Sequence, residues 1–297
     1  MSRVIHSDGL QWPAPMAGRL RSRLWNRWRS GSVRRVEVQG RGTVYRFLCD
    51  NLIEYARCAG LFIKEPGTCE WIRRDVRPGD VFFDIGANIG IYTIMAAHQV
   101  GPAGKVVAFE PHAANFAALI NNVAANGFGD RVIPCNVGAH ASSGFLTFNY
   151  ASLAAGTSNS QLDGDCVPGR APFHPVAHEL KPAVALDELV AAGVLPRPTH
   201  VKIDVDGNEL EIMAGMAGLL SHPDRPRSLS VEVNAEEQVE CEQQLVLCGY
   251  RLTSTNETRT GAKRKRQGRW SAHDRYNAIF EATNPERRRA AANGAEA

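Results

Sequence analysis

The sequence predicts an α/β fold, an open and mostly parallel sheet with helices on both faces. Short apolar runs alternate with helix-patterned stretches over most of the chain, which is typical of strand–helix–strand units joined by right-handed crossovers. One such unit, VFFDIGANIGIYT at residues 81–93, joins a buried strand to a helix through a glycine turn. Because ligands of doubly wound sheets bind at the carboxyl ends of the strands, this turn is the predicted centre of the protein.

The glycine turn differs from the fingerprint of dinucleotide-binding proteins. Gly86 and Gly90 have no glycine at the second place of G-x-G-x-x-G. Asp84 precedes them, and a carboxylate about 4 Å from a pyrophosphate would cost about 4 kcal/mol at an effective dielectric of about 20. With a ligand that carries an ammonium and a sulfonium, the interaction with Asp84 is attractive instead of repulsive. The turn, which includes Asn88, therefore predicts a site for S-adenosylmethionine.

A second acid follows the next predicted strand, Lys105–Phe109. Glu110 lies one strand–helix–strand unit after the turn, where an acid accepts both hydroxyls of a ribose in nucleotide-binding α/β folds. The third predicted strand ends at Asn136 and Val137, where an adenine would stack and form hydrogen bonds. The alternative is a structural glycine turn with Glu110 as an ordinary acid at a strand end.

The amino-acid composition argues against several other classes of protein. The 297 residues are 44% hydrophobic and 22% charged, which is typical of a globular protein with a substantial core. The net charge of +3 gives no global basic field for nucleic acid. Seven cysteines without C-x-x-C spacing argue against a disulfide framework or a zinc site and favour the cytoplasm. No apolar run is long enough to span a membrane, and no signal peptide is recognisable at the start.

Composition also divides the chain into regions. We expect a basic, flexible N-terminal arm (residues 1–32), with no regular element in its first 18 residues, and an extension that packs on the core (33–75). The main domain covers 76–284, with a variable loop at 151–181 that is rich in Gly, Ser, Asn and Pro. The tail, 285–297, has the composition of a disordered segment.

The arm contains a basic stretch with two tryptophans, RLRSRLWNRWR at residues 19–29. At 100° per residue its leucines and tryptophans form one stripe, and most arginines lie outside it. Such a short helix suits an anionic membrane surface. One hypothesis is that the arm brings a cytoplasmic enzyme to the inner face of the membrane and to a lipid-linked acceptor. The competing interpretations are a solvated tail, or apolar side chains that pack back on the domain.

The second half of the chain supplies the remaining strands. His200–Ile203 is a predicted strand that ends at Asp204, and Asn208 and Glu211 have the spacing of a capping box for the helix that follows. Leu229–Val233 is the next strand, and Tyr276–Glu281 is the last. The charge of Lys263–Arg266 predicts a loop.

With these pieces placed, the chain resembles the FkbM family of S-adenosylmethionine-dependent methyltransferases. The matching stretches are DIGANIGIYT (84–93), AFEP (108–111), ALDEL (185–189), KIDVDGNELEIMAG (202–215), VEVN (231–234) and YNAIFE (276–281). The resemblance implies a Rossmann-like class I methyltransferase fold, a seven-stranded sheet whose last strand is antiparallel. It also implies O-methylation of a hydroxyl on a sugar, glycolipid or natural product. Asp206 departs from the family, which more often has Glu there.

Methyl transfer requires that the acceptor oxygen be aligned and its proton removed. Asp204 is the first candidate for the base or for the residue that orients the acceptor, and strand alternation places Lys202 on the same face. Glu209 and Glu232 are the next candidates.

Three alternatives remain open at this level. Asp204, Glu232 and Asn234 could supply oxygen ligands for Mg²⁺, although the prediction is a site without metal. The protein could instead be a dinucleotide-dependent oxidoreductase, which Asp84 disfavours, or a non-catalytic binding module that retains the fold.

Overall fold

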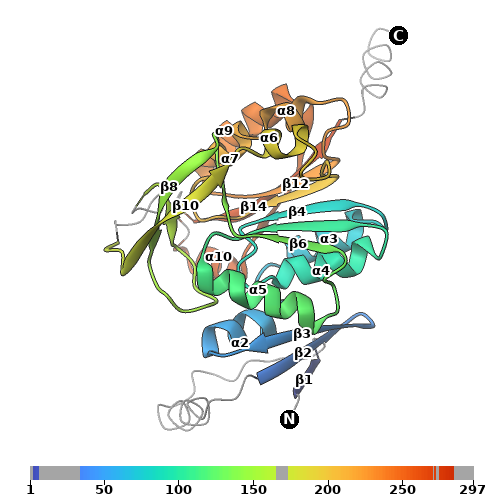
Figure 1. Cartoon of the computed structure of the whole chain (residues 1–297), viewed down its shortest axis with the longest axis vertical. Coiled ribbons are helices and arrows are strands. Elements are labelled where there is room, and N and C mark those ends of the chain that lie inside the picture. Colours follow the sequence, from blue (N-terminus) through green and yellow to red (C-terminus); the bar gives the residue numbers. More distant parts are fainter. Residues whose placement is uncertain (1–2, 7–33, 165–172, 270, 272–273, 284–297) are drawn as a thin grey trace.

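The computed structural model describes residues 3–6, 34–164, 173–269, 271 and 274–283. Seven strands form the central sheet in the order β13-β14-β12-β11-β4-β5-β6 (Figure 1). Their bounds are β4 Val81–Ile85, β5 Lys105–Phe109, β6 Val132–Cys135, β11 His200–Ile203, β12 Ser228–Val233, β13 Tyr250–Glu257 and β14 Tyr276–Ala282. The strand β14 runs antiparallel to both of its neighbours, whereas β12, β11, β4, β5 and β6 pair in parallel. The predicted mostly parallel, seven-stranded sheet is confirmed.

Helices cover both faces of this sheet, as predicted. The first layer contains α3 (Pro66–Asp75), α4 (Ile91–Val100) and α5 (Ala113–Ala125), and the second contains α6 (Leu186–Ala191), α7 (Glu209–Ala214), α8 (Ala217–Ser221) and α9 (Ala235–Leu247). Alternation along β4 shows why both layers form, because Phe82 packs in the first core cluster and Phe83 in the second. Both side chains are fully buried.

The segment before the core is a second, three-stranded sheet with one helix. It consists of β1 (Arg3–His6), β2 (Arg34–Gly40), β3 (Thr43–Cys49) and α2 (Leu52–Ala59). Two amides, one on α5 and one at its C-cap, hold it, since the backbone N–H of Leu48 donates to Asn122 Oδ1 at 2.7 Å and that of Arg46 to Asn126 Oδ1 at 3.0 Å. The expectation that the first 18 residues hold no element is wrong for β1, whose backbone pairs in parallel with β2. The stretch 19–29 lies outside the described residues.

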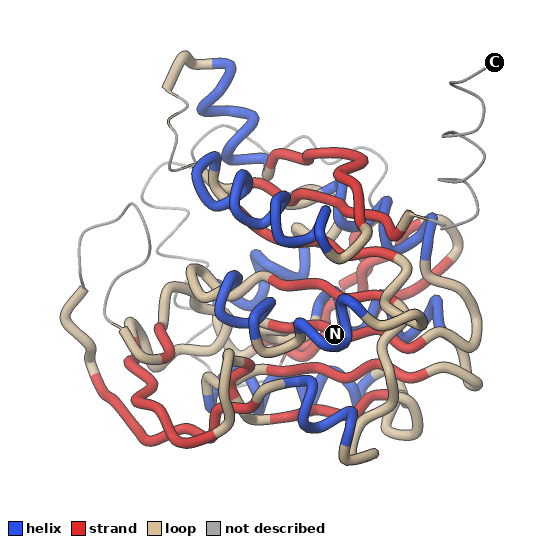
Figure 2. The backbone as a smooth tube through the Cα atoms, turned by 90° about the horizontal axis from the view of Figure 1, so that it is seen from above, coloured by secondary structure: helices blue, strands red, loops and turns tan. Residues whose placement is uncertain are grey.

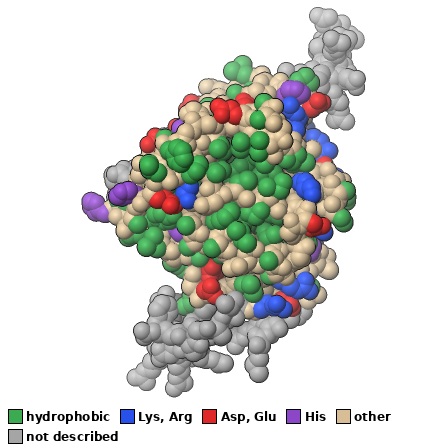
Figure 3. All heavy atoms as spheres, viewed as in Figure 1, with side chains coloured by type: hydrophobic (Ala, Val, Ile, Leu, Met, Phe, Trp, Pro, Cys, Tyr) green, Lys and Arg blue, Asp and Glu red, His purple; other side chains and the backbone are tan. Residues whose placement is uncertain are grey.

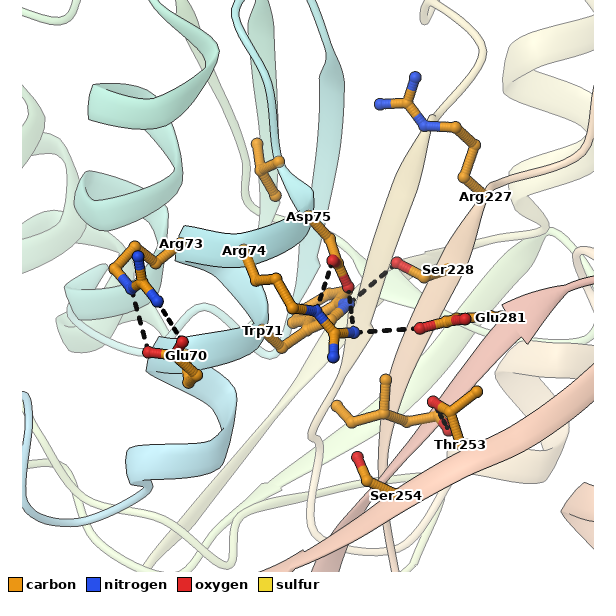
Figure 4. Close-up of polar contacts among 12 residues, drawn as sticks. Glu70, Trp71, Arg73, Arg74, Asp75, Arg227, Ser228, Thr253, Ser254 and Glu281 are labelled. Carbon is orange, nitrogen blue, oxygen red and sulfur yellow. Dashed lines mark hydrogen bonds and ion pairs between the residues drawn. The ribbon is translucent and has the colours of Figure 1, made fainter.

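The helix α3 attaches this segment to the amino edge of the sheet. Pro66 is its first residue, as predicted. Figure 4 shows Trp71 Nε1 donating to Ser228 Oγ, at 2.9 Å, and Arg74 between Asp75 and Glu281. The extension is thus joined to the strands β12 and β14 by polar contacts as well as by apolar packing.

A smaller sheet lies beside the carboxyl edge of the central one. It contains β7 (Gly138–Ala139), β10 (Ala177–Val184), β8 (Gly144–Tyr150) and β9 (Gln161–Leu162). The expectation of an irregular loop over 151–181 is wrong at β9 and at the start of β10. The reason is that β10 pairs antiparallel with β8 from Ala177 to Ala183, which supplies backbone hydrogen bonds that the local sequence does not reveal.

Two further expectations are wrong. The basic stretch expected as a loop is a helix, α10 (Arg259–Arg266), whose N-cap Thr258 accepts from the backbone N–H of Gly261 at 3.1 Å. Its charges are tolerated because Lys263–Arg266 are exposed. Asn208 makes no capping bond to α7; its Nδ2 instead donates to the carbonyl of Leu162 at 2.8 Å. The side chain is therefore used to join the two sheets.

Candidate active site

A cavity of about 990 Å³, open to solvent, lies at the carboxyl edge of the central sheet. Its lining comes mainly from the turns that follow β4, β5, β6 and β11 and from Glu232 near the end of β12, together with α2 and residues 157–160 and 162. Predicted site residues that line it are Gly86, Asn88, Glu110, Val137, Lys202, Asp204 and Glu232. Asp84, Gly90, Asn136 and Glu209 are not part of the lining, but they contact the lining residues Lys202, Ala87, Glu110 and Val205 respectively.

The glycine turn places the ends of two strands in contact. Gly86 has φ of +80°, and a Cβ on it would lie 1.9 Å from the carbonyl oxygen of Asp204. Gly90, with φ of +85°, caps α4 where a Cβ would lie 2.5 Å from Leu119 Cδ1. These positions require glycine both for space and for backbone conformation. The turn after β4 and the turn after β11 therefore form one continuous wall.

Glu110 reaches this wall from the end of β5. Its Oε2 accepts from the backbone N–H of Asn88 at 2.7 Å, and its Oε1 accepts from that of His112 at 2.9 Å. Burial raises the pKa of Glu110 to about 7, although these two backbone donors favour the charged form. Each oxygen keeps a lone pair for a further donor in the cavity.

Residues 154–160, which we call the strap, cross one side of the cavity. Asn88 has the left-handed φ of +52° and its Nδ2 donates to the carbonyl of Thr157 at 2.8 Å. Asn115, on α5, binds the strap twice, through the backbone N–H of Gly156 and the carbonyl of Thr157. Arg57, on α2, donates to the carbonyl of Gly156 and to Ser158 Oγ. Three separate elements thus hold the strap at this end.

The other end of the strap is held by the turn after β11. Asp206 has φ of +67°, and its carboxylate accepts from the backbone N–H of Asn159 at 2.9 Å. Gln161 Nε2 donates to the Asp206 carbonyl at 3.1 Å. Backbone strain at Asn88 and at Asp206 therefore coincides with the two attachments of one segment.

The part of the cavity near β6 is apolar. Val137, Ala139, Phe148 and Leu162 line it. Asn136 does not line this part; its Nδ2 donates to the carbonyl of Glu110 at 2.7 Å. It therefore supports the backbone of Glu110.

Asp84 and Asp204 share one lysine at the opposite part of the cavity. Lys202 Nζ lies 2.9 Å from Asp204 Oδ2 and 3.7 Å from Asp84 Oδ1, and Asp84 Oδ2 accepts from Thr93 Oγ1 at 2.5 Å. Lys202 also lies 5.2 Å from the centre of the Tyr92 ring. Although burial opposes it, Lys202 and Lys64 hold the pKa of Asp204 well below its usual range. The predicted face-sharing of Lys202 and Asp204 is confirmed.

Arg275 is a central residue of the site that sequence reasoning missed. This side chain, 8% exposed, pairs with Glu232 at 2.9 Å and Glu237 at 3.3 Å, and also with Glu209. The backbone N–H groups of Val205 and Gly207 donate to Glu209 Oε1. One guanidinium thus joins the turn after β11 to the end of β12.

Carboxylates outnumber cations in and beneath the cavity. Ion pairs join Lys64 to Glu65, Lys202 to Asp84 and Asp204, and Arg275 to Glu209, Glu232 and Glu237. Burial and the neighbouring Asp204 carboxylate raise the pKa of Glu232 well above its usual range. Burial likewise raises the pKa of Glu209 to about 7. The ligand-free cavity is therefore suited to a cation.

In the described part of the chain, no group of three or more His, Cys, Asp or Glu side chains is arranged to hold a metal ion. Within the same residues, no helix combines the length and the apolar character needed to cross a bilayer.

Nothing in the sequence pairs Arg275 with three distant glutamates, and Arg57 and Lys64 reach the cavity from the N-terminal extension. The only sequence signal for Arg275 was its position in the chain. Arg275 directly precedes a strand that was predicted to end the sheet, so its side chain had to lie at the edge where the other strands end.

Comparison with known proteins gives one family and several relatives. A family model described as "Methyltransferase FkbM domain" matches residues 84–252. The hexuronic acid methyltransferase AglP of Haloferax volcanii is 30% identical over 206 residues, 67% of this chain and 76% of the relative. The 31-O-demethyl-FK506 methyltransferase FkbM of Streptomyces tacrolimicus is 31% identical over 162 residues, 48% of this chain and 61% of the relative. A crystal structure of methyltransferase FkbM from Methylobacillus flagellatus KT is 14% identical, with a TM-score of 0.44, over 72% of this chain and 50% of that one.

Proposed function

The chain belongs to the FkbM family of methyltransferases, and from that premise we propose that it moves a methyl group from S-adenosylmethionine to a hydroxyl of a sugar, a glycolipid or a natural product. The two relatives named above are described as methyltransferases for a hexuronic acid and for 31-O-demethyl-FK506, so a sugar and a natural product each have a precedent as acceptor. The observation that carries the proposal is Glu110, a buried carboxylate with free lone pairs at the wall of the cavity.

The residues present fit S-adenosylmethionine. Glu110 would accept from the ribose hydroxyls, and the apolar part of the cavity, lined by Val137 and Phe148, would hold the adenine. The excess of carboxylates around Lys202 and Arg275 would favour the positively charged ammonium and sulfonium groups of the cofactor's methionine end. When bound, the cofactor supplies an electrophilic methyl group on a positively charged sulfur.

The remaining work falls to the chain's own side chains. Glu232 lines the cavity, and its raised pKa makes it a stronger proton acceptor than Asp204. We assign removal of the hydroxyl proton to Glu232 Oε1 and orientation of the acceptor to Asp204. Lys202 fixes Asp204 through the 2.9 Å ion pair, and Arg275 fixes Glu232 through its Nε. Glu209 then acts indirectly, by holding the turn that carries Asp204.

Removal of the Glu110 carboxylate tests the cofactor assignment. Glu110→Ala should weaken S-adenosylmethionine binding by about 1.5–3 kcal/mol, the range for a hydrogen bond to a charged group. Calorimetric titration of the purified chain measures this. The matched control is Glu188→Ala, an exposed acid on α6 that does not line the cavity and should leave affinity unchanged. Equal affinity of all three proteins would refute the assignment.

The same titration should depend on pH in one direction. The pKa of Glu110 is about 7 in the ligand-free chain, so the carboxyl is increasingly protonated below pH 7 and accepts fewer hydrogen bonds there. Affinity should therefore rise as the pH is raised through about 7. In Glu110→Gln this rise should be smaller, because only Glu209 and the other cavity carboxyls still titrate there.

We propose a metal-independent reaction, because Lys202 and Arg275 already occupy the positions next to Asp204 and Glu232 that Mg²⁺ would need. EDTA should leave turnover unchanged in enzyme purified without added metal. A loss of activity that Mg²⁺ restores would instead assign the oxygen ligands to a cation.

A further inference from the structure

The helix α10 and the turn after it carry an unusual share of the positive charge. The segment 257–275 contains seven basic and two acidic residues, a net charge of +5, whereas the whole chain has +3. The rest of the chain therefore carries −2. Charge concentrated in this way creates a local field that attracts anions and is not averaged over the surface.

Topology places this segment at the same edge of the sheet as the cavity. Val233, at the carboxyl end of β12, pairs with Tyr276 at the start of β14, and Tyr276 pairs with Glu257 at the end of β13. The connection from β13 through α10 to β14 therefore lies where the parallel strands end. Arg264 on α10 lies 2.9 Å from Asp274, the neighbour of Arg275, which contacts the cavity residue Glu232.

Much of this charge faces solvent without a carboxylate partner. Ion pairs neutralise Arg264 through Asp274 and Lys265 through Glu257. Among the described residues, no Asp or Glu oxygen lies within 4.0 Å of the side-chain nitrogens of Lys263, Arg266 or Arg269, and all three residues are exposed. Figure 2 shows one helix that extends away from the rest of the backbone and is followed by a short loop and a grey segment, as α10 is followed by residue 270. The face drawn in Figure 3 differs, since apolar side chains cover its middle.

We propose that Lys263, Arg266 and Arg269 bind a diphosphate group that carries the acceptor sugar, outside the cavity that receives the reacting hydroxyl. This inference rests on the proposed function. Lysine and arginine are the usual partners of phosphate oxygens, and three closely spaced cations match the charge of one diphosphate.

The composition of α10 favours a diphosphate ester over a membrane surface. Interfacial helices bury an apolar face between the lipid headgroups, and the largest apolar side chain of α10 is that of Ala262. The surface would therefore hold its ligand by charge alone. Binding should weaken steeply as the salt concentration rises.

A charge-matched pair of triple variants tests the proposal. The first is Lys263→Gln/Arg266→Gln/Arg269→Gln. The control is Arg74→Gln/Arg77→Gln/Arg251→Gln, which removes the same charge from the opposite edge of the sheet, where Figure 4 shows Arg74. Calorimetry with inorganic pyrophosphate should give a dissociation constant about tenfold higher or more in the first variant, since losing one charge-assisted hydrogen bond has that effect. The control should bind like the wild type, and glucose should bind to none of the proteins.

The outcomes separate this surface from the proposed function. Pyrophosphate binding that is equal in both triple variants would overturn the proposal. The proposal would also fail if the wild type sedimented with phosphatidylglycerol vesicles and the first variant did not, while neither of these two proteins bound pyrophosphate. The partner of this surface would then be a bilayer. S-adenosylmethionine affinity, measured in parallel, should be the same in all proteins. If the cofactor does not bind while the pyrophosphate difference persists, the proposed function fails and the anion site stands.

Discussion

Glu232→Gln should lower kcat by about 10²–10⁴-fold, the usual contribution of a positioned base. The amide keeps the shape of the side chain and can accept from Arg275, but it cannot take the proton of the acceptor hydroxyl. Cofactor affinity should change far less, because the variant retains Glu110 and the apolar part of the cavity. The acceptor is first identified by its mass gain of one methylene in the presence of the enzyme. The rate at which a radioactive methyl group is transferred to that acceptor then measures kcat.

Two further variants complete this experiment. One is its control, and the other could contradict the assignment of the base. Glu237→Gln changes another carboxylate bound by the same arginine, but Glu237 does not line the cavity, so its kcat should stay near that of the wild type. If Asp204→Asn abolishes turnover while Glu232→Gln retains it, the proton passes to Asp204 and our assignment is wrong.

Arg275→Gln should destabilise the fold by about 3–5 kcal/mol, as expected when one partner of a buried ion pair is removed. The substitution leaves Glu209 and Glu232 buried without a cation, and it weakens the hold on Glu237. Urea unfolding at pH 7 measures the loss. The loss should shrink toward pH 5, because carboxyls whose folded-state pKa is raised take up protons there and lose the charge that is costly to bury.

The control for charge removal is Arg251→Gln. Arg251 is 65% exposed and pairs with Glu281 at 3.5 Å, so its removal should cost at most about 1 kcal/mol. If the two variants unfold at the same urea concentration, the Arg275 cluster does not stabilise the fold.

The central sheet, and the part of the cavity lined by the glycine turn and Glu110, were largely predictable from sequence. The buried β4, with Phe82 and Phe83, is an apolar run broken only by Asp84 in the sequence, and the glycine turn at Gly86 follows it directly. These signals are local. The position of Glu110 follows from the same strand–helix–strand unit.

The features that were missed depend on pairing between distant segments. The hydrogen bonds of β10 come from β8, and the role of Arg275 comes from glutamates that lie 38 to 66 residues away. Basic residues in α10 favoured a loop, because helix formation there depends on Thr258 and not on an apolar stripe. Sequence periodicity carries none of this information.

The smallest fragment that retains the complete cavity must contain Arg57, Lys64 and Arg275. The segment matched by the family model, 84–252, excludes all three residues. An excised fragment with those limits would lose the α2 anchor of the strap and the counter-charge of Glu232. It would also lack β14 and so break the sheet between β12 and β13. Domain fusions and truncations of this enzyme should therefore be cut outside residues 34–283.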